Sequence, residues 1–337
     1  MRKYKLAFIP ILCLLFFGCV ETLITINVLP DARYRMSIIS KGDKEDIEDN
    51  DFSLPKSNEW SIKTFQEIDD ETGDIIYFSS SEGLLKGTNL LINNDHKGAL
   101  RYPISVKLKK GFFSDTFILH QIFEGRKVDK KYPTLTQALA EPNDESKQAI
   151  VFTEVMLYCL KEYLYNTKSQ FTIESLLKER IINHFNGAFY KANQDGNLKE
   201  ISKHEKNESE DIITLPENFI RSNFQPFKDM FPDGYIDSSL IGMLPCIDEA
   251  NSTIRLNDDT FKLIGTLPGR VFMSNSDSVY SDTLFWSFDL KDFTNDSYIV
   301  EAASIIYYPK KIQKAILVGT IIILFVLFLI AKRKAIL

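Results

Sequence analysis

Two uncharged apolar runs, one near each end of the 337-residue chain, constrain its fold more than any other feature. The first covers Leu6 to Gly18 and the second covers Ala315 to Ala331. The first is too short to span a bilayer. The second, extended by Ile312 and Gln313, gives roughly 25 to 30 Å of helix at about 1.5 Å per residue. The sequence therefore predicts one export signal and one transmembrane helix.

The first nineteen residues have the layout of a bacterial lipoprotein signal peptide. A basic start, "MRKYK", precedes the apolar run, and Gly18 stands directly before Cys19. This ending resembles a lipobox, in which the Cys thiol accepts a diacylglyceryl group before cleavage, although Phe16 stands where Leu is usual. We therefore expect lipidation of Cys19. An uncleaved anchor and an ordinary buried Cys are the alternatives.

Three basic residues stand on each side of the C-terminal helix, so the flanking charge does not fix its orientation. The orientation follows instead from the location of the N-terminus. If "MRKYK" stays in the cytoplasm, the body is exported and the helix has to cross back. We therefore expect a signal peptide at 1–19, a transmembrane helix at 310–332 and a cytoplasmic tail at 333–337, with the body outside the cytoplasmic membrane. A buried core helix is the alternative, but no polar face interrupts the run.

The body between these segments is acidic. The flanks of the two runs hold nine basic residues and no carboxylate, which leaves 31 basic against 46 acidic residues in 20–309, a net charge of −15. Such a surface is repelled by phosphate backbones, which argues against nucleic acid as a partner. The acidic loop at 41–58 lacks the Gly-centred spacing of a calcium loop, so we interpret it as a solvated linker.

Strand patterns occur at both ends of the body. After Cys19, "VETLITINV" alternates apolar and polar residues, "PDAR" is typical of a turn, and "YRMSIIS" returns as a second strand. Short β-rich pieces fill the rest of an N-terminal β region at 20–124 and of a C-terminal β region at 246–309, beginning with "STIRLN". The predicted fold is α+β: an antiparallel β-rich exported domain built from both ends of the chain, with a helical insertion at 125–245 and a C-terminal transmembrane helix. Pairing of the terminal strands would bring both anchors to one membrane.

Two amphipathic helices are predicted in the insertion. One follows an N-cap at 143–145 and carries one apolar face. The other covers Thr172 to Phe185 and ends near Gly187. An aromatic group downstream is either a seam of the core, which we favour, or the lining of a groove for an apolar ligand. The first apolar face is made by Phe152, Val155, Met156, Cys159, Leu160 and Tyr163, and the aromatic group by Phe219, Phe224, Phe227, Phe231 and Phe261.

No catalytic signature occurs: G-x-S-x-G, H-E-x-x-H, G-x-x-x-x-G-K and Cys-x-x-Cys are all absent. The histidines lack a Cys or a second His at ligand spacing, so no metal, cofactor or catalytic residue is predicted. Export permits a disulfide between Cys159 and Cys246. We nevertheless expect a buried free thiol at Cys159, because that is the ordinary outcome for a Cys on an apolar helical face. The histidines are His96, His120, His184 and His204.

Two stretches resemble LppM-type bacterial lipoproteins. One is "GTLPGRVFMSNSDSVYSDTLFWSFDLKDF" at 265–293, and the other is "CVETLITINVLPDARYRMS" at 19–37, similar to the family's lipidated Cys, strand, Pro-Asp turn and strand. The helical insertion has no counterpart in the small family domain. The resemblance implies an exported, membrane-associated β-rich module, for which lipid or glycolipid binding is one candidate role, and it implies no enzymatic activity. In the first stretch the pattern of Pro-Gly, strand, Asn-containing turn and strand ending near Trp is carried by Pro268, Gly269, Asn275 and Trp286.

These observations predict a membrane-anchored extracytoplasmic lipoprotein, a noncatalytic binding or assembly module of the cell envelope. Its expected partners are the membrane and either an envelope protein or an apolar ligand. An envelope hydrolase of unrecognised type is the alternative, and it requires a cleft where a His, a carboxylate and a Ser meet.

Overall fold

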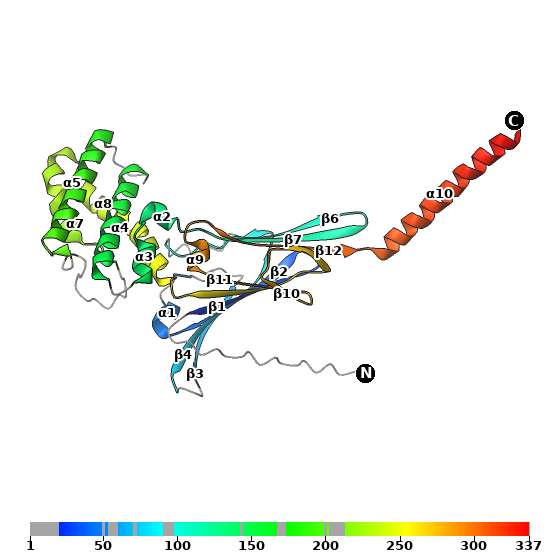
Figure 1. The fold of residues 1–337 in the computed structure, drawn as a ribbon, viewed down its shortest axis with the longest axis horizontal. Helices are drawn as coiled ribbons and strands as arrows, with labels where there is room; N and C mark the ends of the chain where they lie inside the picture. Colours follow the sequence, from blue (N-terminus) through cyan, green and yellow to red (C-terminus); the bar gives the residue numbers. More distant parts are fainter. Residues whose placement is uncertain are drawn as a thin grey trace.

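The computed structural model describes residues 20–48, 51–52, 60–69, 73–89, 98–141, 144–166, 173–198, 201 and 213–336. The expected signal peptide with Cys19 lies outside the described residues, as do His96, His204 and part of the acidic loop. The described protein is α+β, with two β-sheets, a block of helices and an apolar C-terminal helix, which confirms the predicted fold class (Figure 1).

Two sheets face each other across one hydrophobic core. Sheet A has the strand order β10-β11-β8-β1-β2-β4-β3, and sheet B has the order β5-β6-β7-β12-β9. The strands of sheet A are β1 (Glu21–Val28), β2 (Arg33–Gly42), β3 (Trp60–Ile68), β4 (Ile75–Lys86), β8 (Thr260–Thr266), β10 (Ser278–Tyr280) and β11 (Thr283–Asp289). Those of sheet B are β5 (Thr88–Asn89), β6 (Ile104–Lys110), β7 (Ser114–Phe123), β9 (Arg270–Ser274) and β12 (Tyr298–Tyr307).

The predicted N-terminal hairpin is confirmed. β1 and β2 pair antiparallel over their full length, and every second residue of β1 from Thr22 is buried, as the alternation requires. The turn between them closes with a hydrogen bond of 2.8 Å from the Leu29 amide to the Arg33 carbonyl, and Ala32 takes a positive φ of 63°. The Asp31 carboxylate accepts from the Arg33 amide and guanidinium, and these bonds lower the pKa of Asp31.

The terminal strands pair, but in parallel and not antiparallel. β1 pairs with β8, and the Thr260 amide donates to the Val20 carbonyl at 2.9 Å. Val20 therefore lies at the end of the sheet where β8 begins, next to the helical block. β12 starts near this end and runs away from it over ten residues, roughly 33 Å at about 3.3 Å per residue, to the C-terminal helix. Strand pairing therefore leaves Val20 and α10 at opposite ends of the sandwich, and the expectation that both anchors reach one membrane stays a prediction.

Aromatic rings dominate the core between the sheets. Phe261 and Phe288 stack at 5.3 Å, and Tyr298 stacks on Phe288 at 4.3 Å. Phe52, from the predicted acidic linker, is buried and stacks on Tyr102 at 4.6 Å. That segment is therefore packed at this point, and it also contains the short helix α1 (Lys44–Glu48).

The helices between β7 and β8 form a block with its own core. They are α2 (Val128–Lys131), α3 (Leu135–Ala140), α4 (Glu145–Tyr165), α5 (Ser175–Gln194), α7 (Glu217–Phe224), the 3-10 helix η1 (Gln225–Met230) and α8 (Tyr235–Arg255). The Asp144 side chain caps α4 by accepting from the amides of Ser146 and Lys147. The predicted apolar face of this helix is buried throughout.

Two helices extend past their predicted ends. α5 continues through Gly187 because Phe189 and Ala192 keep facing the core, and Gly196, at a φ of 75°, follows its C-terminus. α8 continues through Pro245 to Arg255 for the same reason, with Ile247 and Ala250 buried beyond the proline. The prediction of a strand at "STIRLN" is therefore wrong: its first four residues end α8, the last two form a turn, and α8 crosses the expected boundary at 245.

The predicted group of five phenylalanines divides between the two cores. Phe224 and Phe227 are buried in the helical block, with Phe219 and Phe231 packed against them, whereas Phe261 belongs to the sheet core. These side chains pack inside the two cores, and none of them lines the hollows found in the described part of the chain. Leu139 contacts both cores, so it lies at the boundary between them.

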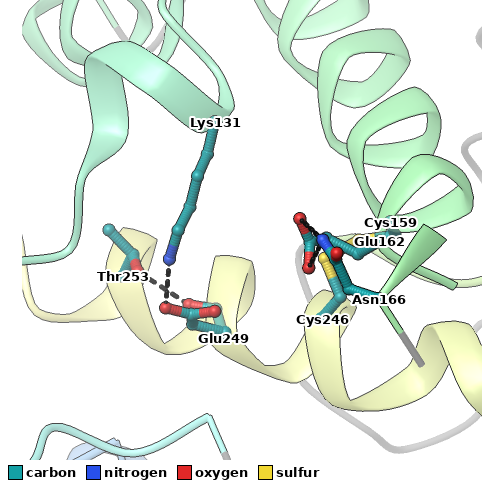
Figure 2. The surroundings of a disulfide bond; sticks show 7 residues. All are labelled: Lys131, Cys159, Glu162, Asn166, Cys246, Glu249 and Thr253. Carbon is teal, nitrogen blue, oxygen red and sulfur yellow. Dashed lines mark hydrogen bonds and ion pairs between the residues drawn. A yellow bond between two sulfur atoms is a disulfide. The ribbon is translucent and has the colours of Figure 1, made fainter. Parts of the chain in front are cut away.

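A buried arginine joins the block to the sheets. The Arg126 guanidinium donates to Thr253 Oγ1 and to the carbonyls of Gly98 and Glu249, each at 2.8 Å. Burial lowers the pKa of Arg126, and the Glu249 carboxylate opposes that shift. Lys131 Nζ also binds the Glu249 carboxylate at 2.5 Å (Figure 2). Because buried polar groups without partners are destabilising, these contacts hold the block in one position against the sheets.

A disulfide links Cys159 of α4 to Cys246 of α8 (Figure 2). The two Cα atoms are 5.4 Å apart. The helices approach closely because α8 has Gly242 at the contact, where a Cβ would lie 2.3 Å from the Tyr163 ring. The favoured expectation of a free thiol at Cys159 is wrong, because the close approach of α4 and α8 brings Cys246 within bonding distance.

Replacing Cys159 and Cys246 together by Ala should lower the free energy of unfolding by about 2 to 4 kcal/mol, because the bridge constrains residues 87 positions apart in the unfolded chain. The measurement is urea denaturation of the full chain in detergent, followed by circular dichroism at helix wavelengths. Wild type treated with reductant should match the double variant. Equal midpoints for oxidised wild type and the variant would contradict the expectation.

Candidate functional site

A groove of about 470 Å³ lies between the edge strands β9 of sheet B and β10 of sheet A. Its volume is within the range of small-molecule sites, roughly 300 to 1,000 Å³. Nine residues line it: Arg270, Val271, Phe272, Met273, Ser274, Ser276, Val279, Ser281 and Asp282. They come from one short segment of the chain that crosses from one sheet to the other, so the groove lies on an open side of the sandwich.

The Pro268–Gly269 step creates this crossing. Gly269 has a φ of 83°, and a Cβ there would lie 2.4 Å from the Ile305 carbonyl oxygen, so only glycine fits the turn. The Pro268 carbonyl accepts a hydrogen bond from the Ser304 hydroxyl at 2.7 Å. The chain thereby leaves sheet A after β8 and joins β12 in sheet B as β9. The step is therefore a turn that needs a residue without Cβ at position 269.

Asn275 holds the far end of the groove together. Its Oδ1 accepts from the Trp286 indole at 3.0 Å and from the Glu301 amide at 2.8 Å, and its Nδ2 donates to the Ile299 carbonyl at 2.6 Å. Trp286 belongs to sheet A, while Ile299 and Glu301 belong to sheet B. One side chain therefore connects both sheets next to the lining residue Ser276.

The groove has a mixed lining with more polar than apolar surface, and Phe272, Met273 and Val279 form its apolar part. Phe272 is 59% exposed, Met273 is 49% exposed and Val279 is 56% exposed, which is unusual for three large apolar side chains in one groove. Arg270 and Asp282 add one positive and one negative group. The Ser276 hydroxyl oxygen is buried without a hydrogen bond among the described residues. Such a mixed surface can accept a ligand that has both an apolar part and a polar part.

A second hollow of about 350 Å³ lies on the helical block. It includes Leu176, which is exposed although its spacing predicts burial, together with Met230 and the charged pair Glu174 and Arg180. It lies on the part of the molecule opposite the C-terminal helix (Figure 1). Since it has fewer polar groups and no counterpart of the Asn275 network, we take the β9–β10 groove as the candidate site.

The described histidines do not form a catalytic cleft. His120 Nε2 lies 3.3 Å from the Glu301 carboxylate on the outer face of sheet B, and Ser105 is opposite His120 in register. No hydrogen bond joins that serine to the imidazole among the described contacts, and neither hollow includes His120. His184 packs its ring against Phe185 and Phe227. Within the described ranges no group of three or more His, Cys, Asp or Glu side chains could hold a metal ion.

The predicted site residue, Cys19, lies outside the described residues, so its lipidation stays a prediction. The groove itself was missed by the sequence interpretation. A signal for it exists: "RVFMS" places three apolar residues in a row in a short strand, and strict alternation would bury only every second one. Consecutive apolar residues on an edge strand leave some of them exposed.

Comparison with known proteins gives a weak relationship only. No protein-family model matches the chain, and no curated protein matches it. Among solved structures, it is similar to the NMR structure of the folded domain of LppM from Mycobacterium tuberculosis, with 10% sequence identity and a TM-score of 0.30. The alignment covers 88% of this chain and 96% of that domain. At these values the similarity carries no conclusion about function.

Asn275→Ala should lower the free energy of unfolding by about 1 to 3 kcal/mol, because it leaves the Trp286 indole and two backbone groups without partners. Near-ultraviolet circular dichroism of Trp286 should weaken at the same time. Asn257→Ala is the matched control, since that side chain bonds only the exposed Asp258 in the described contacts. An equal, small effect of both substitutions would refute the proposed connection between the sheets.

Proposed function

We propose that this protein is a noncatalytic lipoprotein of the cell envelope, tethered to the cytoplasmic membrane, that binds an amphiphilic ligand in the β9–β10 groove. The observation that carries the proposal is the exposure of three large apolar side chains, Phe272, Met273 and Val279, in a groove that also has polar and charged lining residues. Large apolar side chains left in water mark binding sites, and a mixed lining suits a ligand with a polar end.

The C-terminal helix supports the membrane tether. α10 (Pro309–Ile336) follows β12 after a single residue, and Pro309–Leu329 is long and apolar enough to cross a membrane. At about 1.5 Å per residue these 21 residues cover roughly 31 Å. The helix projects alone from the sandwich, and its apolar side chains are exposed (Figure 1). A core helix of a soluble protein would be buried.

The disulfide supports export of the body. Disulfides form and persist outside the cytoplasm, where thiols are not kept reduced. The Cys159–Cys246 bridge lies in the helical block, so the proposal places that block on the outer side of the membrane.

Lipidation of Cys19 remains part of the proposal and has a geometric consequence. Cys19 directly precedes Val20, whose carbonyl is bonded in sheet A at the end next to the helical block. A lipid there would enter the membrane roughly 33 Å from α10, the length of β12. With both anchors in one bilayer, the sandwich would lie lengthwise along the membrane surface.

Ligand binding is tested with photoactivatable palmitic acid added to proteoliposomes of the full chain. Trypsin separates a peptide that contains the groove, residues 271–291, from the rest. This peptide should be labelled, and Met273→Asp should reduce the label about fivefold or more, because a carboxylate beside an acyl chain has to lose its water. Excess unlabelled palmitate should compete.

Tyr190→Asp, on the exposed surface of the helical block, is the matched control and should leave the labelling unchanged. Label on the groove peptide that neither competes nor responds to Met273→Asp would refute binding in the groove. Copurification of an envelope protein with native material, without any amphiphile, would instead favour a protein partner.

Lipidation and topology are tested on cells. Mass spectrometry of the mature protein should find an N-terminal Cys19 with a diacylglyceryl group, and Cys19→Ser should leave the chain unprocessed because the lipid acceptor is lost. Protease added to spheroplasts should degrade the body of the wild type. An unprocessed wild-type chain whose middle resists protease would overturn the export of this protein.

A further inference from the structure

The hairpin between β6 and β7 ends in two exposed aromatic rings. The hairpin tip consists of residues 110–114. Phe112 is 73% exposed and Phe113 is 43% exposed, and their rings contact each other edge to face at 4.9 Å. The hairpin closes with a hydrogen bond of 2.8 Å from the Gly111 amide to the Ser114 carbonyl. The two rings therefore sit on a short, closed turn at the end of sheet B (Figure 1).

Direct contacts attach the hairpin tip to the start of α10. The Tyr308 amide donates to the Phe113 carbonyl at 2.8 Å, and Tyr307 pairs in register with Ser114. The Tyr308 hydroxyl donates to Asp115 at 2.5 Å, and this bond raises the pKa of the tyrosine. The hairpin tip is thus held at a defined height relative to the first turn of the helix.

One lysine contacts the rings of this region, and four more lysines are close to them in the sequence. Lys311 Nζ lies 4.2 Å from the centre of the Tyr308 ring and 5.9 Å from that of Phe112. Aromatic rings and lysines together are the composition found where a protein crosses the surface of a bilayer, since rings prefer the headgroup level and lysines bind anionic headgroups. The lysines of this region are Lys109, Lys110, Lys310, Lys311 and Lys314.

We propose that the hairpin tip is a second membrane contact: Phe112 and Phe113 insert into the headgroup region of the leaflet that α10 enters. The proposal rests on the membrane span of α10, and it is independent of ligand binding in the groove. A bilayer is the occupant because the hairpin tip is bonded to the residue just before the span, so lipid is present there whenever α10 crosses the membrane. The contact would add a second point of attachment beside α10 and so limit the tilt of the sandwich relative to the membrane.

The test uses the full chain in vesicles of phosphatidylcholine and phosphatidylglycerol, with a Phe112→Trp reporter. Lipids brominated near the headgroup end of their acyl chains should cause about a twofold loss of its fluorescence, and lipids brominated near the chain ends should quench less, because interfacial rings stay shallow. Emission should also shift to shorter wavelength on reconstitution. The signal of the native Trp60 and Trp286 is measured on wild type and subtracted.

Two further reporters separate the possible failures. Tyr190→Trp, 66% exposed on the helical block, is the matched control and should respond to aqueous iodide but not to brominated lipid. Phe325→Trp reports on α10 and should be quenched by the deep bromines. Quenching of Phe325→Trp without quenching of Phe112→Trp would overturn the hairpin contact alone. Loss of both signals would overturn the membrane span on which it rests.

Discussion

The parallel pairing of β1 with β8 is the constraint on which the rest of the structure depends. A parallel pair needs a long connection that returns the chain to the same end of the sheet, and here that connection contains the remaining strands up to β7 and the whole helical block. The block therefore lies where β8 starts, beside Val20. β12 then carries the chain to the other end, where α10 begins. The helical block and α10 therefore lie at opposite ends of the long axis of the molecule (Figure 1).

The same topology leaves an open side, and the candidate site is there. The chain changes sheets at Pro268–Gly269, so β9 and β10 become edge strands of different sheets and enclose a groove. Asn275 bonds both sheets beside it and accepts from the Trp286 indole. The four residues that carry the resemblance to LppM-type lipoproteins thus have structural roles at this corner.

Local pattern predicted much of the fold. Alternation identified the β1–β2 hairpin, and the spacing of apolar residues identified the buried face of α4, because each depends on neighbours in the sequence. The sequence pattern gave wrong predictions where packing between residues far apart in the chain decides the structure. Gly187 and Pro245 are typical of helix ends, yet helices pass through both because Phe189 and Ile247 keep contacting the core. The choice between a disulfide and a free thiol depended on how closely α8 approaches α4 at Gly242.

The sequence by itself determined the length and apolarity of α10, the acidity of the body, and the mixture of strands and helices, since these are properties of consecutive residues. Only the tertiary structure decided that Val20 and α10 lie at opposite ends of the sandwich, that large apolar side chains stay exposed between β9 and β10, and that Phe112 sits beside Lys311. These features depend on which strands pair and in which direction. Backbone hydrogen bonds form the same way for many sequences, so the pairing is selected by the packing of the whole core and is not encoded in local periodicity.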